Sequence, residues 1–299
     1  MRKEVRKIKN VVAVAITAAI LFLTVLGYIF DTYDYLKTKL FASADYTDSY
    51  VEMFDVGQGD SILIYSGGKA ALIDTGTKSY ADSITKTMRL KGIDTLDMLL
   101  ITHNHSDHMG GIVPLTEELK VKNLVIPDLS KTDERTDKMR TAIGNVKASG
   151  GNCVTAQQGM SFNVGKFNIS VIAAFYDEKD ENDRSIITVA QIGKWRFLFT
   201  GDAQEPVEKR LMEDGINIRC DVLKVGHHGS MYGTSEEFLE AVSPSLAMIS
   251  CGKGNRYSHP HDVVLLRLKE AGVQYYRTDI NGSVTYTVDE KEITVKTEK

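Results

Sequence analysis

The stretch Leu99–Gly111, LLITHNHSDHMGG, constrains the fold of this chain more than any other. It opens as an apolar run typical of a buried strand and continues into three histidines and an aspartate, His103, His105, Asp107 and His108. Imidazole and carboxylate together suit zinc, or manganese where more oxygen enters the coordination shell. A polar turn with incidental histidines is the alternative. So dense a group of ligand-type residues favours metal binding.

Two later segments end apolar strands in the same way. FLFTGDA places Asp202 after a strand and a Thr-Gly turn, and LKVGHHGS places His227 and His228 after another. Gly-Asp turns are common, but adjacent histidines at the end of a buried strand are not. We therefore expect three distant strand ends to converge on one metal site.

The N-terminus predicts a membrane anchor. Residues 1–10 form a basic tail, and residues 11–30 contain no charge. A helix of that length, at about 1.5 Å per residue, crosses a hydrocarbon core of roughly 30 Å. The basic flank predicts a cytoplasmic N-terminus, so the rest of a single-pass protein lies outside the cytoplasm. A cleaved signal peptide, giving a secreted protein, is the alternative, but its candidate site at Ala42-Ser43-Ala44 lies far downstream of an unusually long apolar run.

Charge and cysteine content exclude two classes of protein. The tail carries +4 and the whole chain −4, so residues 11–299 carry −8. This acidic balance gives no broad basic footprint for duplex nucleic acid. Three widely spaced cysteines, Cys153, Cys220 and Cys251, fit no disulfide framework and are expected to be small buried side chains.

After a polar, Tyr-rich spacer at 31–48, one folded domain is expected over 49–299. Short apolar or alternating runs predict strands, and apolar residues at helical spacing predict helices. Strand runs interleaved with single helices indicate two packed sheets with helices outside. The expected strands are 50–56, 60–66, 69–76, 96–102, 123–127, 167–174, 185–192, 195–201, 221–226, 245–250, 273–279 and 283–289, and the expected helices are 80–91, 132–148, 204–213, 235–242 and 262–272.

These motifs, taken together, resemble a known family. The order T-H-x-H-x-D-H, T-G-D and G-H-H-G-S resembles the metallo-β-lactamase superfamily. FDVGQGDSILI, DVLKVGHHGS and NRYSHPHDVVLLRLKEAG look more specifically like the soluble domain of the ComEC-type DNA-uptake family. That resemblance covers roughly Tyr50–Asp289. NDRSIITVAQIGKWRFLFTGD is also similar to the teichoic-acid phosphorylcholine esterases.

The resemblance implies an α/β fold, an αββα sandwich with two metal ions at one rim, here preceded by the one transmembrane helix that the apolar run predicts. The donor types indicate divalent Zn²⁺ or Mn²⁺. By position, the first ion would be held by His103 and His105, the second by Asp107, His108 and His228, and both by Asp202. On the residues alone, either of the adjacent histidines can be the ligand, and the resemblance favours His228.

The resemblance also implies roles around the ligands. His227 and Asp202 would be catalytic, with His227 facing the substrate. Asp74 would support the ligand loop, although on its own it is typical of a turn. Asp60, His259 and His261 would lie close to the substrate, with helix capping and surface turns as the alternative.

The sequence departs from the family in three places. Many superfamily members have a further histidine ligand where this chain has Asn182 and Ser185. The first ion would then have three protein ligands and an open position for water, as a catalytic site needs. ComEC-type domains often lack the second histidine of the cluster, whereas His105 is present. With a single apolar span, this chain cannot form a multi-span channel.

These observations predict a membrane-anchored binuclear-metal hydrolase acting outside the cytoplasm. A phosphodiesterase or nuclease is favoured, because a pair of cations suits an anionic phosphodiester. The substrate would be DNA or a cell-envelope polymer, and the sequence does not identify a protein partner. A phosphorylcholine esterase-like hydrolase is the alternative enzyme. β-Lactam hydrolysis is less favoured because the absent histidine is usual in that group, and the intact ligand set opposes a non-catalytic binding module.

Overall fold

The computed structural model describes residues 21–22, 24–25, 49–129 and 135–299. The predicted basic tail, the predicted spacer and most of the predicted anchor lie outside these ranges. The four described residues of the anchor range have helical backbone. No helix in the described ranges combines the length and apolarity that crossing a membrane requires.

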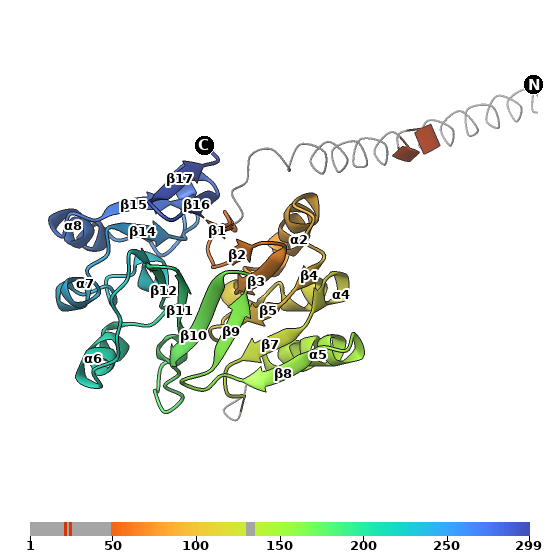
Figure 1. Ribbon diagram of the computed structural model, residues 1–299, viewed down its shortest axis with the longest axis horizontal. Coiled ribbons are helices and arrows are strands. Elements are labelled where there is room, and N and C mark those ends of the chain that lie inside the picture. The colour runs from red at the N-terminus through yellow and green to blue at the C-terminus, as the bar shows by residue number, and fades with distance from the viewer. Residues whose placement is uncertain (1–20, 23, 26–48, 130–134) are drawn as a thin grey trace, which may run out of the picture. The chain divides into compact units, whose positions relative to one another are not determined.

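Two large sheets are formed by the described residues (Figure 1). The first has eight strands, in the order β17 (Ile293–Thr297), β16 (Val284–Val288), β1 (Ser49–Met53), β2 (Ile62–Ser66), β3 (Lys69–Ile73), β5 (Met98–Leu100), β7 (Asn123–Ile126) and β8 (Asn152–Thr155). The second has seven, in the order β15 (Gln274–Arg277), β14 (Leu246–Ile249), β13 (Val222–Lys224), β12 (Trp195–Phe199), β11 (Ile187–Ile192), β10 (Phe167–Ala173) and β9 (Ser161–Val164). A short pair, β4 (Thr95–Leu96) and β6 (Lys120–Val121), lies apart.

Each sheet is antiparallel in one half and parallel in the other. Neighbours from β17 to β3 and from β9 to β12 pair antiparallel, joined mostly by hairpins. The pairs from β3 to β8 and from β12 to β15 are parallel. Parallel neighbours need crossover connections, which is why helices gather beside these halves.

The helices cover the outer faces of the sandwich. In Figure 1, α6, α7 and α8 lie beside the second sheet and α4 and α5 beside the first. Within residues 49–129 and 135–299, the helices and helical turns are α2 (Ala81–Leu90), α3 (Ser106–Met109), α4 (Ile112–Glu118), α5 (Arg135–Ala148), α6 (Glu205–Glu213), α7 (Glu236–Val242), α8 (Asp262–Glu270), α9 (Thr278–Asn281), η1 (Lys78–Tyr80), η2 (Asn182–Arg184) and η3 (Gly226–Gly229). The predicted αββα sandwich is confirmed.

The main core lies between the two sheets. Val51 and Ile64 of the first sheet belong to one buried cluster with Phe197 of the second. Tyr286 of β16 is fully buried, and its hydroxyl donates a hydrogen bond to the carbonyl of Ala247 in β14. This contact ties the two sheets together through a satisfied polar group.

The topology also explains where the histidines lie. Parallel strands present their carboxyl ends at one edge of a sheet, where α/β proteins commonly place their sites. The carboxyl ends of β3 and β5 in the first sheet, and of β12, β13 and β14 in the second, lead into the loops that carry the ligand-type residues.

Candidate metal centre

The loops after three strands bring the predicted ligand-type side chains together. His103 and His105 follow β5, Asp202 follows β12, and His227 and His228 follow β13. Because a backbone fixed by strand pairing holds each loop, these side chains converge without a long flexible segment between strand and site. The structure therefore places together residues that are separated by more than a hundred positions in the sequence.

His103, His105 and Asp202 form the first group. The Nε2 of His103 lies 3.0 Å from the Nδ1 of His105 and 3.8 Å from the Oδ2 of Asp202. One ligand atom from each residue lies within 4.8 Å of the other two. His103 and Asp202 are buried and His105 is partly buried. This group fits a cation at the edge of a cavity.

Asp60, His108, Asp202 and His228 form the second group, in which every residue is buried. The Oδ2 of Asp202 lies 3.2 Å from the Nε2 of His108 and 3.4 Å from the Nε2 of His228. Asp202 thus belongs to both groups. Two neighbouring groups that share one carboxylate are compatible with a binuclear metal site.

The second nitrogen of two rings is already bound elsewhere. His108 Nδ1 lies 2.7 Å from the Oδ2 of Asp74, and His228 Nδ1 lies 2.9 Å from the carbonyl oxygen of Ser250. Such outer contacts orient histidine ligands in metal sites. They leave both Nε2 atoms directed at Asp202, buried and without a hydrogen bond, like the Oδ1 of Asp202 itself.

Those orphaned atoms support the fit of a metal ion. A buried polar atom without a partner costs about 1–3 kcal/mol, so several at one place need an explanation. Nitrogen and carboxylate oxygen are the donors that zinc and manganese accept. Metal coordination by these side chains would satisfy all of them together.

Asp74, at the end of β3, holds the ligand loop in place. Its Oδ1 accepts a hydrogen bond from the Thr102 backbone N–H at 2.8 Å, and its Oδ2 accepts from the Thr102 hydroxyl at 2.7 Å and from His108. The residue has φ of 60°, in the left-handed region. Asp tolerates this conformation better than most residues.

The turn after β13 is also held in an unusual conformation. His227 and His228 have φ values of 46° and 57°. Left-handed backbone costs an L-residue about 1–2 kcal/mol, and such residues gather at functional sites. In this turn His228 is buried against Asp202, while His227 stays 22% exposed with its Nε2 3.9 Å from the same carboxylate.

Asp107 and Asp60 lie on opposite sides of His228. Asp107 has its Oδ2 3.5 Å from the Nε2 of His228 and keeps 28% of its side chain exposed. Asp60 is buried, with its Oδ1 3.4 Å from the Nδ1 of His228. The structure therefore places Asp60 behind the histidine rather than among the residues that line the cavity.

Asp60 is neutralised by a lysine that the sequence analysis did not single out. Lys224 of β13 is 1% exposed, and its Nζ lies 2.7 Å from the Oδ2 of Asp60. Its Nζ also donates to the carbonyl of Val225 at 2.9 Å. A lysine inside an apolar strand run was the available signal, because a buried lysine is almost always paired.

Buried charges shift the pKa values of the cluster in opposite directions. Burial alone raises the pKa of Asp202, but the neighbouring His108 and His228 hold it well below its ordinary value. Burial likewise opposes ionisation of Asp60, yet Lys224 and His228 lower its pKa to about 2. Against the lowering effect of burial, Asp202 and Asp74 raise the pKa of His108 well above its usual range. The carboxylates around the two imidazoles therefore favour a positive charge at this place, either a proton or a metal ion.

The two groups open onto a cavity of about 480 Å³. It is lined by Gln58, His105, Ser106, Asp107, Asn182, Asp202, His227, His228, Tyr257 and His259. His259 is mostly buried, and burial with the nearby His228 lowers its pKa to about 4. His261 does not line the cavity. Its Nδ1 accepts a hydrogen bond from the Met231 backbone N–H, and its ring lies 5.0 Å from that of His259.

The position of the absent family histidine is filled by two polar residues. Asn182 lines the cavity, and its buried Oδ1 has no hydrogen-bond partner. The Ser185 hydroxyl accepts a hydrogen bond from the Asp202 backbone N–H at 3.0 Å and lies 3.4 Å from the Nδ1 of His103. Ser185 thus supports Asp202 and His103 without adding a nitrogen ligand, while Asn182 contributes a polar wall to the cavity.

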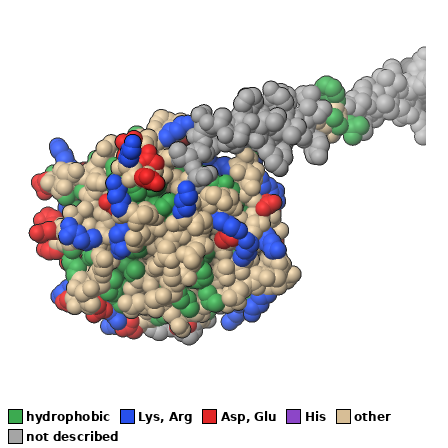
Figure 2. Space-filling model, viewed as in Figure 1, with side chains coloured by type: hydrophobic (Ala, Val, Ile, Leu, Met, Phe, Trp, Pro, Cys, Tyr) green, Lys and Arg blue, Asp and Glu red, His purple; other side chains and the backbone are tan. Residues whose placement is uncertain are grey.

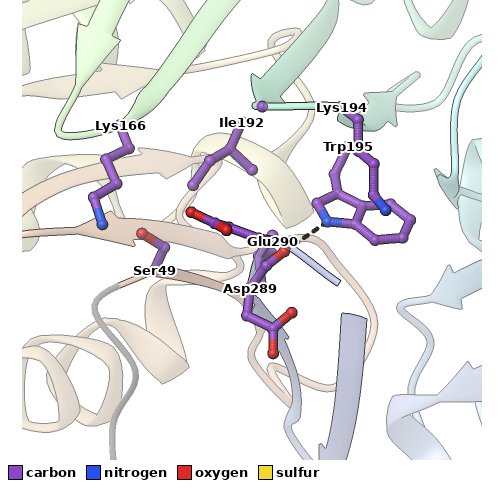
Figure 3. A pocket seen from close by; sticks show the side chains of 9 residues that line it. Ser49, Lys166, Ile192, Lys194, Trp195, Asp289 and Glu290 are labelled. Carbon is purple, nitrogen blue, oxygen red and sulfur yellow. Dashed lines mark hydrogen bonds between the residues drawn. The ribbon is translucent and has the colours of Figure 1, made fainter. Parts of the chain in front are cut away.

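A second cavity, of about 470 Å³, lies among hairpin turns (Figure 3). Lys166, Ile192 and Trp195 line it, and the Trp195 indole N–H donates to the carbonyl of Asp289 at 2.7 Å. No group of metal-ligand type was found there among the described residues. The chemistry of the chain is therefore assigned to the cavity beside Asp202.

Comparisons with known proteins agree with this geometry. The chain is 34% identical over 260 residues to ComE operon protein 3 of Bacillus subtilis (strain 168), covering 80% of this chain and 33% of that protein. It is 30% identical over 241 residues to Competence protein ComA of Neisseria gonorrhoeae, covering 80% and 32%. The predicted resemblance to ComEC-type proteins is confirmed, and the chain spans about a third of the length of these relatives.

The fold and the family are shown as well. The metallo-beta-lactamase fold protein YhfI from Bacillus subtilis matches with a TM-score of 0.52 at 13% identity, over 77% of this chain and 96% of that one. The family model described as Metallo-beta-lactamase superfamily matches residues 54–253. The chain therefore belongs to the metallo-beta-lactamase superfamily, a membership that supports a metal-dependent hydrolase.

Proposed function

We propose that this chain is a binuclear-metal phosphodiesterase, anchored in the membrane by residues 11–30 and acting outside the cytoplasm. One observation carries the proposal. The Oδ2 of Asp202 lies between the Nε2 atoms of His103, His108 and His228, which come from two different sheets. When bound, two divalent ions supply a nucleophile at neutral pH and neutralise charge on a phosphoryl group.

The ligand assignment keeps the first group and, in the second, takes Asp107 in place of Asp60. His103, His105 and Asp202 would hold one ion, and Asp107, His108, Asp202 and His228 the other. Asp60 lies beside the second group and is already paired with Lys224, so we assign it to fixing His228. The mixture of imidazole and carboxylate donors suits Zn²⁺ or Mn²⁺.

His227 and His259 provide the polar wall that faces the substrate. The His227 ring is partly exposed to the cavity, and its Nδ1 has no hydrogen-bond partner. An imidazole N–H at this place would donate to a phosphoryl oxygen or protonate the leaving oxygen. Asp107 and Asp202 line the cavity, and their carboxylates would repel an anionic phosphodiester. The substrate would therefore enter only when the cations are bound.

DNA is the substrate that we favour. The resemblance to the ComEC-type DNA-uptake family, to which these relatives belong, supports it. On the face in Figure 2, basic and acidic side chains are interspersed, and the folded part of the chain is acidic. Contact with a single strand through a few local groups therefore fits the chain better than a long duplex footprint.

Metal content and hydrolysis together test the proposal. The purified full-length chain should hold about two ions, measured by elemental analysis. With Zn²⁺ or Mn²⁺ it should hydrolyse bis-p-nitrophenyl phosphate and single-stranded DNA. The Asp202→Ala variant should lose turnover to the level of the metal-free protein, while its circular dichroism spectrum is unchanged.

Asp137→Ala provides the matched control, because this carboxylate is 81% exposed on α5 and pairs with the likewise exposed Arg140 rather than with any residue of the site. It should retain full activity. Hydrolysis of p-nitrophenyl phosphorylcholine alone would instead identify an envelope esterase. Less than about one ion per chain, together with no turnover of any substrate, would identify a non-catalytic binding module.

A further inference from the structure

Tyr257 stands at the mouth of the metal cavity, and the mechanism above does not use it. The side chain lines the cavity and is 47% exposed. The turn that carries it is held by one side chain. The Asn255 Oδ1 accepts hydrogen bonds from the backbone N–H groups of Tyr257 and His259, and its Nδ2 donates to the carbonyl of Gly252. An open aromatic ring on a braced turn is a fixed surface for a ligand.

The Tyr257 ring continues a row of rings that leads to the metal centre. Tyr257 and His259 are stacked, with centroids 5.6 Å apart and planes inclined by 25°. His259 and His228 are stacked in turn, at 6.3 Å and 29°. These are offset-stacked geometries. A flat group resting on Tyr257 would therefore belong to a part of the substrate adjacent to the phosphoryl group that reacts.

The charge beside the ring distinguishes two kinds of ligand. The exposed Arg256 guanidinium lies 4.8 Å from the Tyr257 ring centroid, and its Nη2 donates to the Tyr257 hydroxyl. This cation repels a quaternary ammonium group such as choline. It attracts a phosphate, and its planar face stacks on nucleobases as readily as the tyrosine does.

Resting on the proposed phosphodiesterase activity, we propose that Arg256 and Tyr257 form a stacking subsite for one nucleobase next to the scissile phosphodiester. The subsite selects an unpaired strand, because a base in a duplex has no free face to offer. It also resolves the difficulty raised by the acidic domain. Stacking supplies affinity that does not depend on neutralising many phosphates.

Two labelled strands with equal numbers of phosphates test the subsite. One is oligothymidylate, and the other has the same length with abasic tetrahydrofuran residues. The full-length protein with Mn²⁺ should show kcat/KM about 5- to 150-fold higher for oligothymidylate, the effect of one stacked base. Tyr257→Leu should bring the ratio close to one, and Tyr257→Phe should keep it.

Tyr232→Leu is the matched control, since Tyr232 is 64% exposed and lies outside the cavity lining. It should leave the ratio unchanged, and a general loss of folding would lower both rates without changing their ratio. Equal cleavage rates for the two strands in the unmodified protein would contradict the stacking subsite but not the phosphodiesterase activity.

If neither strand is cleaved, the proposed phosphodiesterase activity is wrong. Equal binding of the two strands in fluorescence anisotropy would then contradict the stacking subsite as well. Loss of p-nitrophenyl phosphorylcholine hydrolysis in Tyr257→Leu, with the strand ratio unchanged, would show a cation site instead.

Discussion

The two ligand groups share Asp202 but differ in how the protein supports them. We call the second group, around His108 and His228, the buried group, and the first, around His103 and His105, the open group. In the buried group, the Nδ1 of His108 is held by Asp74 at 2.7 Å and the Nδ1 of His228 by the Ser250 carbonyl at 2.9 Å. In the open group, the outer contacts of His103 are longer. Its Nδ1 lies 3.1 Å from the Thr102 hydroxyl and 3.4 Å from the Ser185 hydroxyl.

This difference predicts that the two groups bind a metal ion with different affinities. A fully buried and braced group would lose little freedom when an ion binds, so it would hold that ion tightly. The open group includes the partly buried His105 at the cavity wall and has fewer protein donors. If two ions bind, the one held by the buried group would be the more tightly bound, and the one held by the open group would exchange more readily and lie nearer the substrate.

The largest effect is expected from breaking the charge pair behind the buried group. Lys224→Met leaves the Asp60 carboxylate buried without its cation. Losing one partner of a buried pair costs about 3–5 kcal/mol, so the free energy of unfolding in urea should fall by that amount. The double variant Lys224→Met/Asp60→Asn should recover most of the lost stability, because both charges of this pair are then absent.

A surface pair gives the contrast. The Lys122 Nζ lies 2.7 Å from the Oδ1 of Asp97, as close as Lys224 lies to Asp60, but the Lys122 side chain is 44% exposed. Lys122→Met should change the unfolding midpoint little, since water screens the charge that remains. Equal losses from the two lysine variants would show that Asp60 is not isolated from solvent and would contradict the description of the group around it as buried.

A smaller effect is expected from loosening the outer contacts. Asp74→Asn removes the charge that orients His108 but keeps a residue that accepts the left-handed backbone at this position. The affinity for the tighter ion should fall about 10- to 100-fold in competition with a fluorescent chelator. Ser185→Ala, which alters the outer contact of His103, should weaken mainly the second, looser ion. The reverse pattern, with Ser185→Ala weakening the tighter ion more, would contradict the proposed order of the two ions.

The sequence predicted the convergence of the site because its signals are local. His103, Asp202 and His228 each follow an apolar run directly, and parallel strands bring such positions to one edge. The residues that hold the ligands in place have a weaker signal in the sequence. The Ser250 acceptor is a backbone carbonyl, which any residue provides. The burial of Asp60 depends on Lys224, more than 160 positions away in the sequence.

Apart from β6 of the short pair, the strands that the sequence analysis missed lie at the edges of the two large sheets. β8, β9 and β17 each end a sheet, and their side chains are largely exposed or half-buried. An edge strand needs no continuous apolar run, so its composition resembles that of a loop. The predicted helix over 132–148 is described from Arg135 to Ala148. Apolar periodicity thus predicted the buried central strands of the two sheets but not their exposed edge strands.

The smallest effect separates the two groups most directly, because it is measured without metal. His105→Ala should lower the free energy of unfolding of the metal-free protein by about 0.5 kcal/mol or less, as for a substitution away from the core. His108→Ala should cost about 1–3 kcal/mol, because the Asp74 carboxylate then loses a buried hydrogen-bond partner. Urea unfolding in the presence of a chelator measures both values. Equal losses in the free energy of unfolding would show that His105 and His108 contribute equally to the stability of the metal-free fold. The proposed difference in how the protein supports the two groups would then be wrong.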